Sequence, residues 1–171
     1  MRVSSALAIL TPATAEFFDT ATHVASTEVE IAATSEEAWE LINDHGSWKE
    51  WFSGMKAVEA QPARWTSPGD TRQVTVNAML VSEQAIIVEP GADLAFTILQ
   101  WPLPIATRAA ERVQLVDTSR QGEDRVNVIY TGAFDLTLAG RLVWPVAQRQ
   151  FVSAWGGAFE NLNDAVAARR R

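Results

Sequence analysis

The sequence predicts a single α+β domain, in which a curved antiparallel sheet of about seven strands wraps around a long C-terminal helix and two short helices follow the first strand. Three patterns support this fold class. Apolar and polar residues alternate along residues 23–33 and along most of residues 56–134, which is typical of half-buried strands. The links between the later strands are short and rich in turn residues, which favours antiparallel neighbours. Apolar residues then recur every three or four positions along residues 144–166, the spacing of one helical face.

The first strand is followed by two predicted short helices. Thr34 and Glu37 have the spacing of a capping box, and Trp39 and Ile42 supply the apolar face of the helix that they begin. Gly46 ends this helix, and the segment "SWKEWFSG" predicts a second short helical turn.

The middle of the chain predicts six further strands, and it contains no segment with helical spacing. These strands are residues 55–61, 70–77, 79–89, 93–101, 106–117 and 124–134. A sheet that is apolar on one face needs a partner, and the long amphipathic helix at the end of the chain can provide it. Pro145 suits the first turn of that helix, and the preceding "LAGRLV" is either a short lead-in helix or a loop.

Composition limits the classes of partner. At 171 residues the chain has room for one domain with a substantial core, and 47% hydrophobic residues is ordinary for a globular protein. The net charge of −7 argues against a nucleic-acid partner, because phosphate binding needs a basic surface. No apolar run approaches the roughly 20 residues that span a bilayer, so we expect no integral membrane association. Cysteine is absent, which excludes disulfides and thiolate chemistry, and the oligomeric state stays open.

We expect residues 1–22 to form an extension that packs on a domain made by residues 23–169. The extension begins with Arg2 and an apolar patch at residues 6–10, a faint likeness to a secretory signal. The patch is shorter than the roughly 7–15 apolar residues of a signal core, and it runs into Pro12. The sequence therefore favours a packed extension and a cytoplasmic protein.

Metal, cofactor and nucleophile chemistry have little support. His23 lies at a strand start and His45 lies beside Gly46, where a role at the end of a helix explains it. Two histidines in unrelated elements do not give the spacing of an iron site. There is no Gly-x-Ser-x-Gly turn, and the "WGG" glycines lie inside a helix, whereas a phosphate-binding loop follows a strand. We expect no metal site and no cofactor.

Four segments carry a likeness to a known family: "EIAATSEEAWELINDHGSWKEWFSGM", "PGDTRQVTV", "SEQAIIVEPGADLAF" and "AERVQLVD". Together they resemble the START-like helix-grip superfamily (SRPBCC), particularly its bacterial polyketide cyclase/dehydrase and lipid-transport branch. The likeness covers roughly residues 23–169, and it departs from many members at Val113, where they carry Trp.

The resemblance implies that the last helix lies across the mouth of the sheet and that a ligand cavity lies between them. Members of the superfamily bind lipids, polyketides, hormones or quinones, and only some catalyse reactions. The leading expectation is binding or transport of a hydrophobic small molecule, lipid or polyketide-like. One alternative is a polyketide cyclase or dehydratase acting on an aromatic or polyketide-like substrate. The other is a module that binds a protein or lipid surface without an enclosed ligand, which predicts a collapsed cavity and an exposed apolar patch.

The last helix places its widest and narrowest side chains together. In the helix-grip architecture, Phe151, Trp155 and Phe159 would hold the helix away from the sheet and line the space between them. Gly156 and Gly157 would allow a close approach to the helix backbone or a bend. Tight packing of the helix on the strands, with no ligand, is an equally simple interpretation of the same pattern.

Alternation places three charged side chains on the inner face of the sheet. Arg72 shares a face with Val74, Glu111 shares a face with Val113, and Glu83 is the equivalent inward residue of its strand. A few polar groups in an apolar chamber are typical of small-molecule sites. The predicted ligand-binding residues are Arg72, Val74, Glu83, Phe96, Ile98, Glu111, Val113, Val128, Tyr130, Phe151, Trp155 and Phe159.

Two interpretations of the charged residues are open. In the first, Arg72 pairs with a carboxylate and neutralises a buried charge. In the second, Arg72 anchors a carboxylate or enolate oxygen of the ligand, while Glu111 or Tyr130 handles a proton. Arg72, Glu111 and Tyr130 are therefore the catalytic candidates if the protein is an enzyme, although Tyr130 also suits a simple hydrogen bond from the wall.

Overall fold

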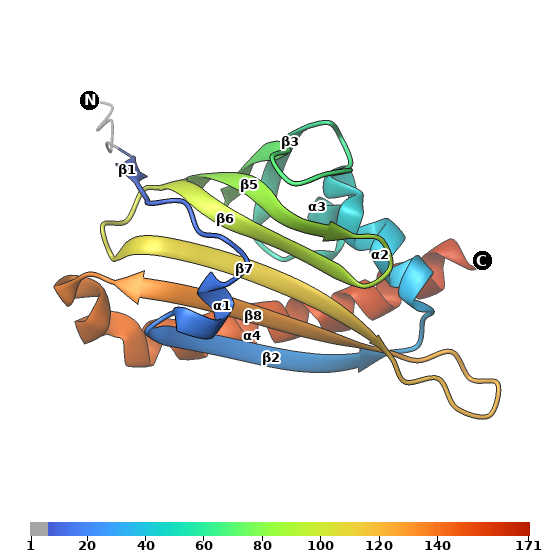
Figure 1. The fold of residues 1–171 in the computed structure, drawn as a ribbon. Helices are drawn as coiled ribbons and strands as arrows, with labels where there is room; N and C mark the ends of the chain where they lie inside the picture. The colour runs from blue at the N-terminus through green and yellow to red at the C-terminus, as the bar shows by residue number, and fades with distance from the viewer. Residues whose placement is uncertain (1–6) are drawn as a thin grey trace.

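The computed structural model describes residues 7–171 as an antiparallel sheet of eight strands with one long helix across it (Figure 1). The strand order is β2-β8-β7-β6-β5-β4-β3, and β1 pairs with β6. The strands are β1 (Ala8–Ile9), β2 (His23–Ile31), β3 (Met55–Gln61), β4 (Thr71–Val76), β5 (Met79–Glu89), β6 (Asp93–Trp101), β7 (Ala106–Asp117) and β8 (Val126–Leu136). The predicted α+β helix-grip class is confirmed.

Strands β3 to β8 form a meander in chain order, and β2 extends this open sheet by pairing with β8. The register places the predicted site residues beside one another. Arg72 of β4 lies opposite Glu83 of β5, and Glu111 of β7 lies opposite Phe96 of β6. Because neighbours in register point to the same face, the inner face carries these charged side chains together.

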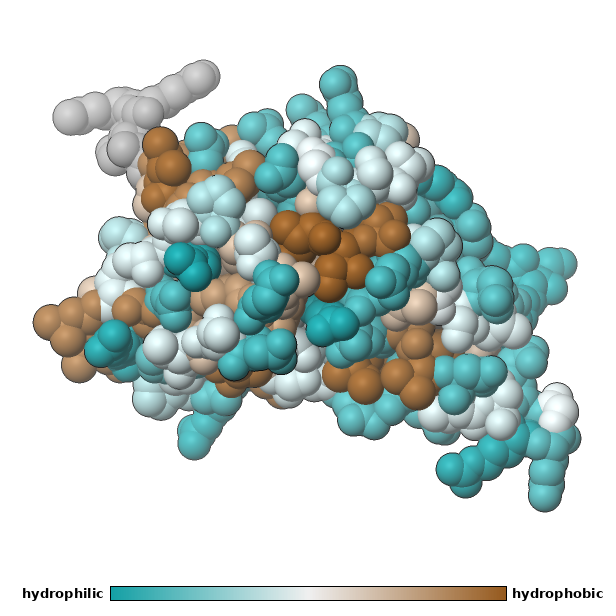
Figure 2. All heavy atoms as spheres, in the orientation of Figure 1, coloured by the Kyte–Doolittle hydropathy of each residue, from teal (hydrophilic) through white to brown (hydrophobic). Residues whose placement is uncertain are grey.

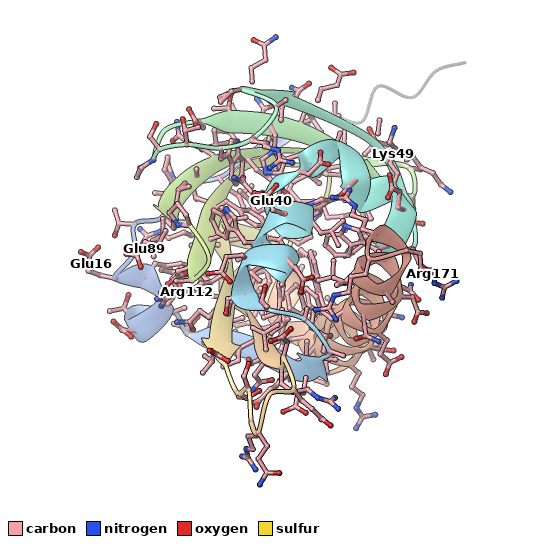
Figure 3. The ribbon with its side chains drawn as sticks, turned by 90° about the vertical axis from the view of Figure 1, so that its right-hand side faces the viewer. Glu16, Glu40, Lys49, Glu89, Arg112 and Arg171 are labelled. Carbon is pink, nitrogen blue, oxygen red and sulfur yellow. The ribbon has the colours of Figure 1, made fainter. Side chains whose placement is uncertain are left out.

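Between β2 and β3 the chain forms the two expected short helices, α2 (Ser35–Asn43) and α3 (Trp48–Trp51), joined by the turn η1 (His45–Ser47). The capping box is present, since the Thr34 hydroxyl accepts from the Glu37 amide and the Glu37 carboxylate accepts from the Thr34 amide. Viewed from the end, the sheet curves around the long helix, and charged side chains such as Lys49 and Arg171 point outward (Figure 3).

The long helix α4 (Leu138–Arg169) begins earlier than the sequence predicts. The Thr137 hydroxyl caps it by accepting from the Gly140 amide, so the lead-in segment is helical. The placement of Pro145 in the first turn is therefore wrong, since this proline lies in the helix interior. Pro145 removes the hydrogen bond to the carbonyl of Arg141, but both residues are exposed and water can satisfy that oxygen.

The two halves of α4 differ in burial. In the C-terminal half Phe159, Leu162 and Val166 are at most 2% exposed against the sheet. In the N-terminal half Leu138 and Leu142 are 77% and 78% exposed. Apolar spheres gather at the left end of Figure 2, where Figure 1 places the start of this helix. Only the C-terminal half of α4 is therefore packed as a core helix.

The segment before β2 lies on the sheet. Strand β1 pairs with β6, and the short helix α1 (Phe17–Thr20) packs on the face of the sheet opposite α4 (Figure 1). Phe17 is 3% exposed there, in a small cluster with Ala110 and Ala133. The packing of residues 7–22 agrees with the predicted extension that packs on the domain. Residues 1–6 lie outside the described part of the chain. The boundary between extension and domain stays a prediction. No helix described in residues 7–171 is both long enough and apolar enough to cross a membrane.

The glycine pair in α4 does not mark a close approach of protein atoms. A Cβ at Gly156 would lie 3.6 Å from Oγ1 of Thr27, and a Cβ at Gly157 would meet nothing within 4 Å. The close approach is at Gly140, where a Cβ would lie 1.9 Å from the carbonyl oxygen of Ile105. Gly140 is therefore the position that seats the start of α4 on the link between β6 and β7.

Gly140→Ala should destabilise the protein, because the new methyl group must push the start of α4 away from the Ile105 carbonyl. We expect a loss of about 1–3 kcal/mol in the free energy of unfolding, measured by urea denaturation. Gly157→Ala, the matched control in the same helix, should raise this free energy by up to about 1 kcal/mol, because alanine favours the helix and meets no obstacle. Equal effects of the two substitutions would contradict this account of Gly140.

Candidate ligand-binding site

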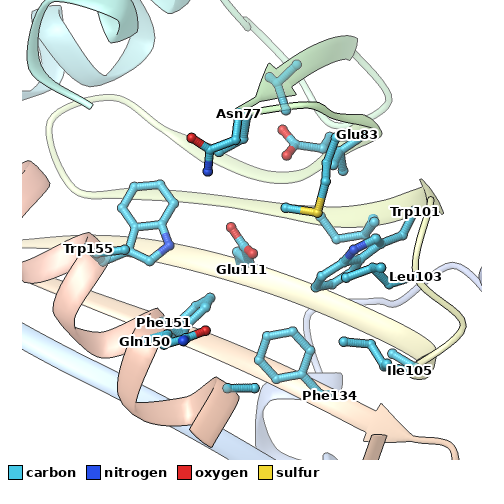
Figure 4. Close-up of a pocket in the computed structure, with 18 of the residues that line it drawn as sticks. Asn77, Glu83, Trp101, Leu103, Ile105, Glu111, Phe134, Gln150, Phe151 and Trp155 are labelled. Carbon is cyan, nitrogen blue, oxygen red and sulfur yellow. The ribbon is translucent and has the colours of Figure 1, made fainter. Parts of the chain in front are cut away.

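A cavity of about 380 Å³ lies between the inner face of the sheet and the N-terminal half of α4 (Figure 4). Strands β3 to β8 contribute to its wall, together with α3 and the turn after it, and with α4 as far as Trp155. Small-molecule sites commonly have volumes of roughly 300–1,000 Å³. The space between helix and sheet is therefore large enough for a ligand.

The wall of the cavity is mostly apolar and strongly aromatic. Its aromatic members are Trp48, Phe52, Trp101, Phe134, Trp144, Phe151 and Trp155. Apart from the indole nitrogens, the side chains with polar atoms are Ser53, Asn77, Glu83, Glu111 and Gln150. A hydrophobic wall with a few polar groups is the usual construction of a small-molecule pocket.

Trp155 marks the point where α4 leaves the sheet. Its ring stacks on Tyr130 of β8 with centroids 3.7 Å apart, and beyond it toward the C-terminus the helix is packed solidly. On the other side Phe151 reaches over Gly132 of β8, where a Cβ would lie 2.5 Å from the Phe151 ring. The absence of a Cβ at Gly132 thus makes room for the Phe151 ring at the inner end of the cavity.

The structure divides the twelve predicted ligand-binding residues into two groups of six. The cavity wall contains Val74, Glu83, Ile98, Glu111, Phe151 and Trp155. The other six lie behind the wall, each at most 2% exposed: Arg72, Phe96, Val113, Val128, Tyr130 and Phe159. Alternation along a strand predicts which face of the sheet a side chain lies on. It does not predict whether α4 packs on that side chain or leaves it beside the cavity. Ligand contact stays a prediction for the six residues in the cavity wall. For the six residues behind the wall, their position in the structure does not support it.

Several wall residues were not predicted. They come from strand ends, from the links between strands and from the first half of α4: Asn77, Met79, Trp101, Leu103, Ile105, Val143, Trp144 and Ala147. The link "PLP" carries Leu103 and leads to Ile105, and apolar residues in a turn were a signal that sequence reasoning could have used.

Arg72 lies behind Glu83 and is enclosed by aromatic rings. Its Nε donates to the Glu83 carboxylate, and its guanidinium carbon lies 4.1 Å from the ring centroid of Trp48 and 4.5 Å from that of Trp65. Nη1 and Nη2 are buried and have no hydrogen-bond partner in the described residues. Ion pairing and cation–π contacts therefore compensate the burial of this charge.

His45 is part of the same buried cluster and does not end a helix. Asp44 is the residue at the C-terminal end of α2, and the His45 ring meets the Trp65 ring edge-on at 4.6 Å. Burial, and then the charge of Arg72, lower the pKa of His45 to about 2. This histidine is therefore neutral and is not available as a cation for the cavity.

Glu111 projects from β7 toward the middle of the cavity (Figure 4). Its carboxylate accepts a hydrogen bond from the Tyr130 hydroxyl. Burial, and then the negative charge of Glu83, raise the pKa of Glu111 to about 8, against the weaker opposing effects of Tyr130 and Arg72. Burial also raises the pKa of Glu83, while the adjacent Arg72 opposes that shift. The cavity therefore holds a carboxyl group that can carry or release a proton near neutral pH.

The curved sheet, the long helix across it and the apolar chamber between them define a helix-grip protein of the START-like (SRPBCC) superfamily. Residues 22–168 match the sequence profile of the polyketide cyclase/dehydrase and lipid transport family, so the chain belongs to this family. No curated protein matches the chain.

Solved structures with low sequence identity share the fold. A protein from Thermus thermophilus superposes with a TM-score of 0.69 at 17% identity, over 87% of this chain and 100% of that one. An aromatase/cyclase from Streptomyces sp. R1128 gives 0.67 at 14% identity, over 87% and 96%. Norcoclaurine synthase from Thalictrum flavum gives 0.63 at 15% identity, also over 87% and 96%. At these identities the likeness establishes the fold alone.

Glu111→Gln should flatten the fall of stability with rising pH. With a pKa of about 8 in the folded protein and an ordinary value of 4.5, Glu111 holds a proton that the unfolded chain has released. The free energy of unfolding of the wild type therefore decreases as pH rises through this interval and levels off above it. Urea unfolding across about pH 5–8 should show the variant gaining stability relative to the wild type.

The control is Glu89→Gln, which removes an exposed carboxylate at the end of β5. Its stability should follow the wild type at every pH. Parallel curves for Glu111→Gln and the wild type would contradict a protonated Glu111 in the folded protein.

Proposed function

We propose that the protein binds a hydrophobic small molecule, lipid or polyketide-like, in the cavity under α4 and carries it in solution. The observation that supports this most is the 380 Å³ space itself, which the surrounding aromatic side chains border without filling. Membership of a family described as polyketide cyclase/dehydrase and lipid transport supports the same class of ligand. A cytoplasmic location stays a prediction.

The polar atoms of the wall suit a ligand that is mainly apolar but has a polar end. The Glu111 carboxyl and the side-chain amides of Asn77 and Gln150 belong to the cavity wall. A ligand that offers groups to these atoms would gain orientation as well as affinity. An interaction module without an enclosed ligand is less well supported, because it predicts a closed interior, although the exposed Leu138 and Leu142 would suit it.

Ala147→Trp should abolish ligand retention without unfolding the protein. Ala147 lies on α4 in the cavity wall, and an indole there would occupy the space that the ligand needs. The wild type, passed over bacterial lipid extracts and examined by native mass spectrometry, should retain about one molecule per chain. The control Ala167→Trp places the same side chain at an exposed site near the end of α4, and this variant should retain the ligand as the wild type does.

Two results would count against carriage of a ligand. One is failure of the wild type to retain any apolar compound from extracts of diverse origin. The other is equal retention by the wild type and Ala147→Trp with circular dichroism spectra that match, which would place the bound compound outside this cavity.

A cyclase or dehydratase is the second candidate, and one observation favours it. Glu111 is a cavity carboxyl with a pKa of about 8, held by the hydroxyl of Tyr130, which suits proton transfer to or from a bound substrate. The solved structure of an aromatase/cyclase with the same fold supports such chemistry in this architecture.

For a compound that the protein both binds and converts, Glu111→Gln should lower the rate of turnover measured at a saturating concentration of that compound. Loss of a positioned acid or base typically costs about 10²–10⁴-fold in rate. Product formation followed by liquid chromatography, with Glu89→Gln as the control, measures this. Undiminished turnover by the Glu111 variant would remove this residue from the mechanism.

A further inference from the structure

The charged side chains of the cavity wall are all acidic. Among the lining residues, all of which lie in the described part of the chain, the ionisable side chains are Glu83 and Glu111, and none is lysine, arginine or histidine. A carboxylate or phosphate on a ligand would therefore meet two acidic groups and no cation. Burying such an anion without a partner is costly in an apolar site.

Arg72 is the nearest basic side chain, but it does not offer a positive charge to a ligand in the cavity. The Arg72 side chain is 0% exposed and lies outside the wall. Its Nε is paired with Glu83, and three aromatic rings surround its guanidinium carbon at 4.1–4.6 Å. Arg72 therefore positions and neutralises Glu83 from behind, and Glu111 is the wall carboxyl that has no basic partner.

The groups that act on Glu111 come from three other strands of the sheet, of which only β8 is adjacent to β7. Tyr130 of β8 donates to it, Glu83 of β5 repels its negative form, and Arg72 of β4 attracts that form weakly. Helix α4, which covers the cavity, adds no charged side chain to the wall, only the neutral amide of Gln150 and the indoles of Trp144 and Trp155. A positive charge brought into the cavity would therefore supply the partner that Glu111 lacks.

The aromatic wall favours the same kind of charge. Trp155, Phe151 and Trp101 surround the position of Glu111 (Figure 4). Aromatic faces attract cations, and the attraction is strongest where water is excluded. A carboxylate with aromatic rings around it is thus complementary to an ammonium group attached to an apolar body.

We propose that the ligand of this cavity is a hydrophobic amine, bound as the ammonium ion beside Glu111. The proposal rests on the proposed small-molecule function and names its ligand class. When the ammonium binds, Glu111 releases its proton to the solvent, so one positive charge enters the cavity and one leaves. At neutral pH binding is accompanied by the release of close to one proton per ligand.

Three probes with one aromatic body test this: 2-(2-naphthyl)ethylamine, 2-(2-naphthyl)ethanol and 2-naphthylacetate, titrated calorimetrically into the wild-type protein at neutral pH. The amine should bind at least about tenfold more tightly than the alcohol, and the acetate should not bind detectably. Repeating the amine titration in buffers with different ionisation enthalpies should show close to one proton released. This measurement needs no variant and is unaffected by any folding defect of one.

Glu111→Gln should reduce amine affinity to that of the alcohol and abolish proton release, while leaving alcohol affinity unchanged. Glu89→Gln should behave as the wild type. Equal binding of all three probes, or tighter binding of the acetate than of the amine, would overturn the amine inference and leave the cavity function standing. Binding of none of the probes would count against both.

Discussion

The stacking of Trp155 on Tyr130 determines where α4 rests on the sheet and where it leaves a space. The two rings lie 3.7 Å apart, and the residues that follow, such as Phe159 and Leu162, are fully buried. Before Trp155 the helix spans the cavity instead of packing on the strands. Tyr130 also donates to the Glu111 carboxylate, so the ring that supports the helix also orients the acid. The contact between Trp155 and Tyr130 therefore affects the packing of α4, the position of the cavity and the orientation of Glu111.

The two carboxyl groups of the cavity differ in what compensates their burial. Glu83 has an arginine behind it, enclosed by rings and by the neutral His45. Glu111 has only a hydroxyl, and it is the group whose pKa rises to about 8. A buried charge with a partner contributes to a stable wall, whereas a buried acid without one is available for a ligand or a proton. The same cavity therefore suits both a carrier and an enzyme.

Much of the fold followed from the sequence, because a sheet buried on one face has a strong period of two. The bounds of β5, β6 and β7 agree with the alternating segments, and the capping box at Thr34 is as predicted. The site was less predictable. Alternation indicated that Arg72 points inward, but not that Glu83 would lie between it and the cavity. The start of α4 also differed, because the turns before and after Pro145 carry exposed apolar side chains such as Leu142 and Val146 outside the single predicted stripe, and the helix begins at the Thr137 cap.

The aromatic wall has a practical consequence. Four of the seven tryptophans, Trp48, Trp101, Trp144 and Trp155, border the same chamber. Indole emission responds to the polarity of its surroundings and to quenching groups nearby. The protein therefore contains its own optical probe, and occupancy of the chamber can be followed in unlabelled material by the colour and intensity of its fluorescence.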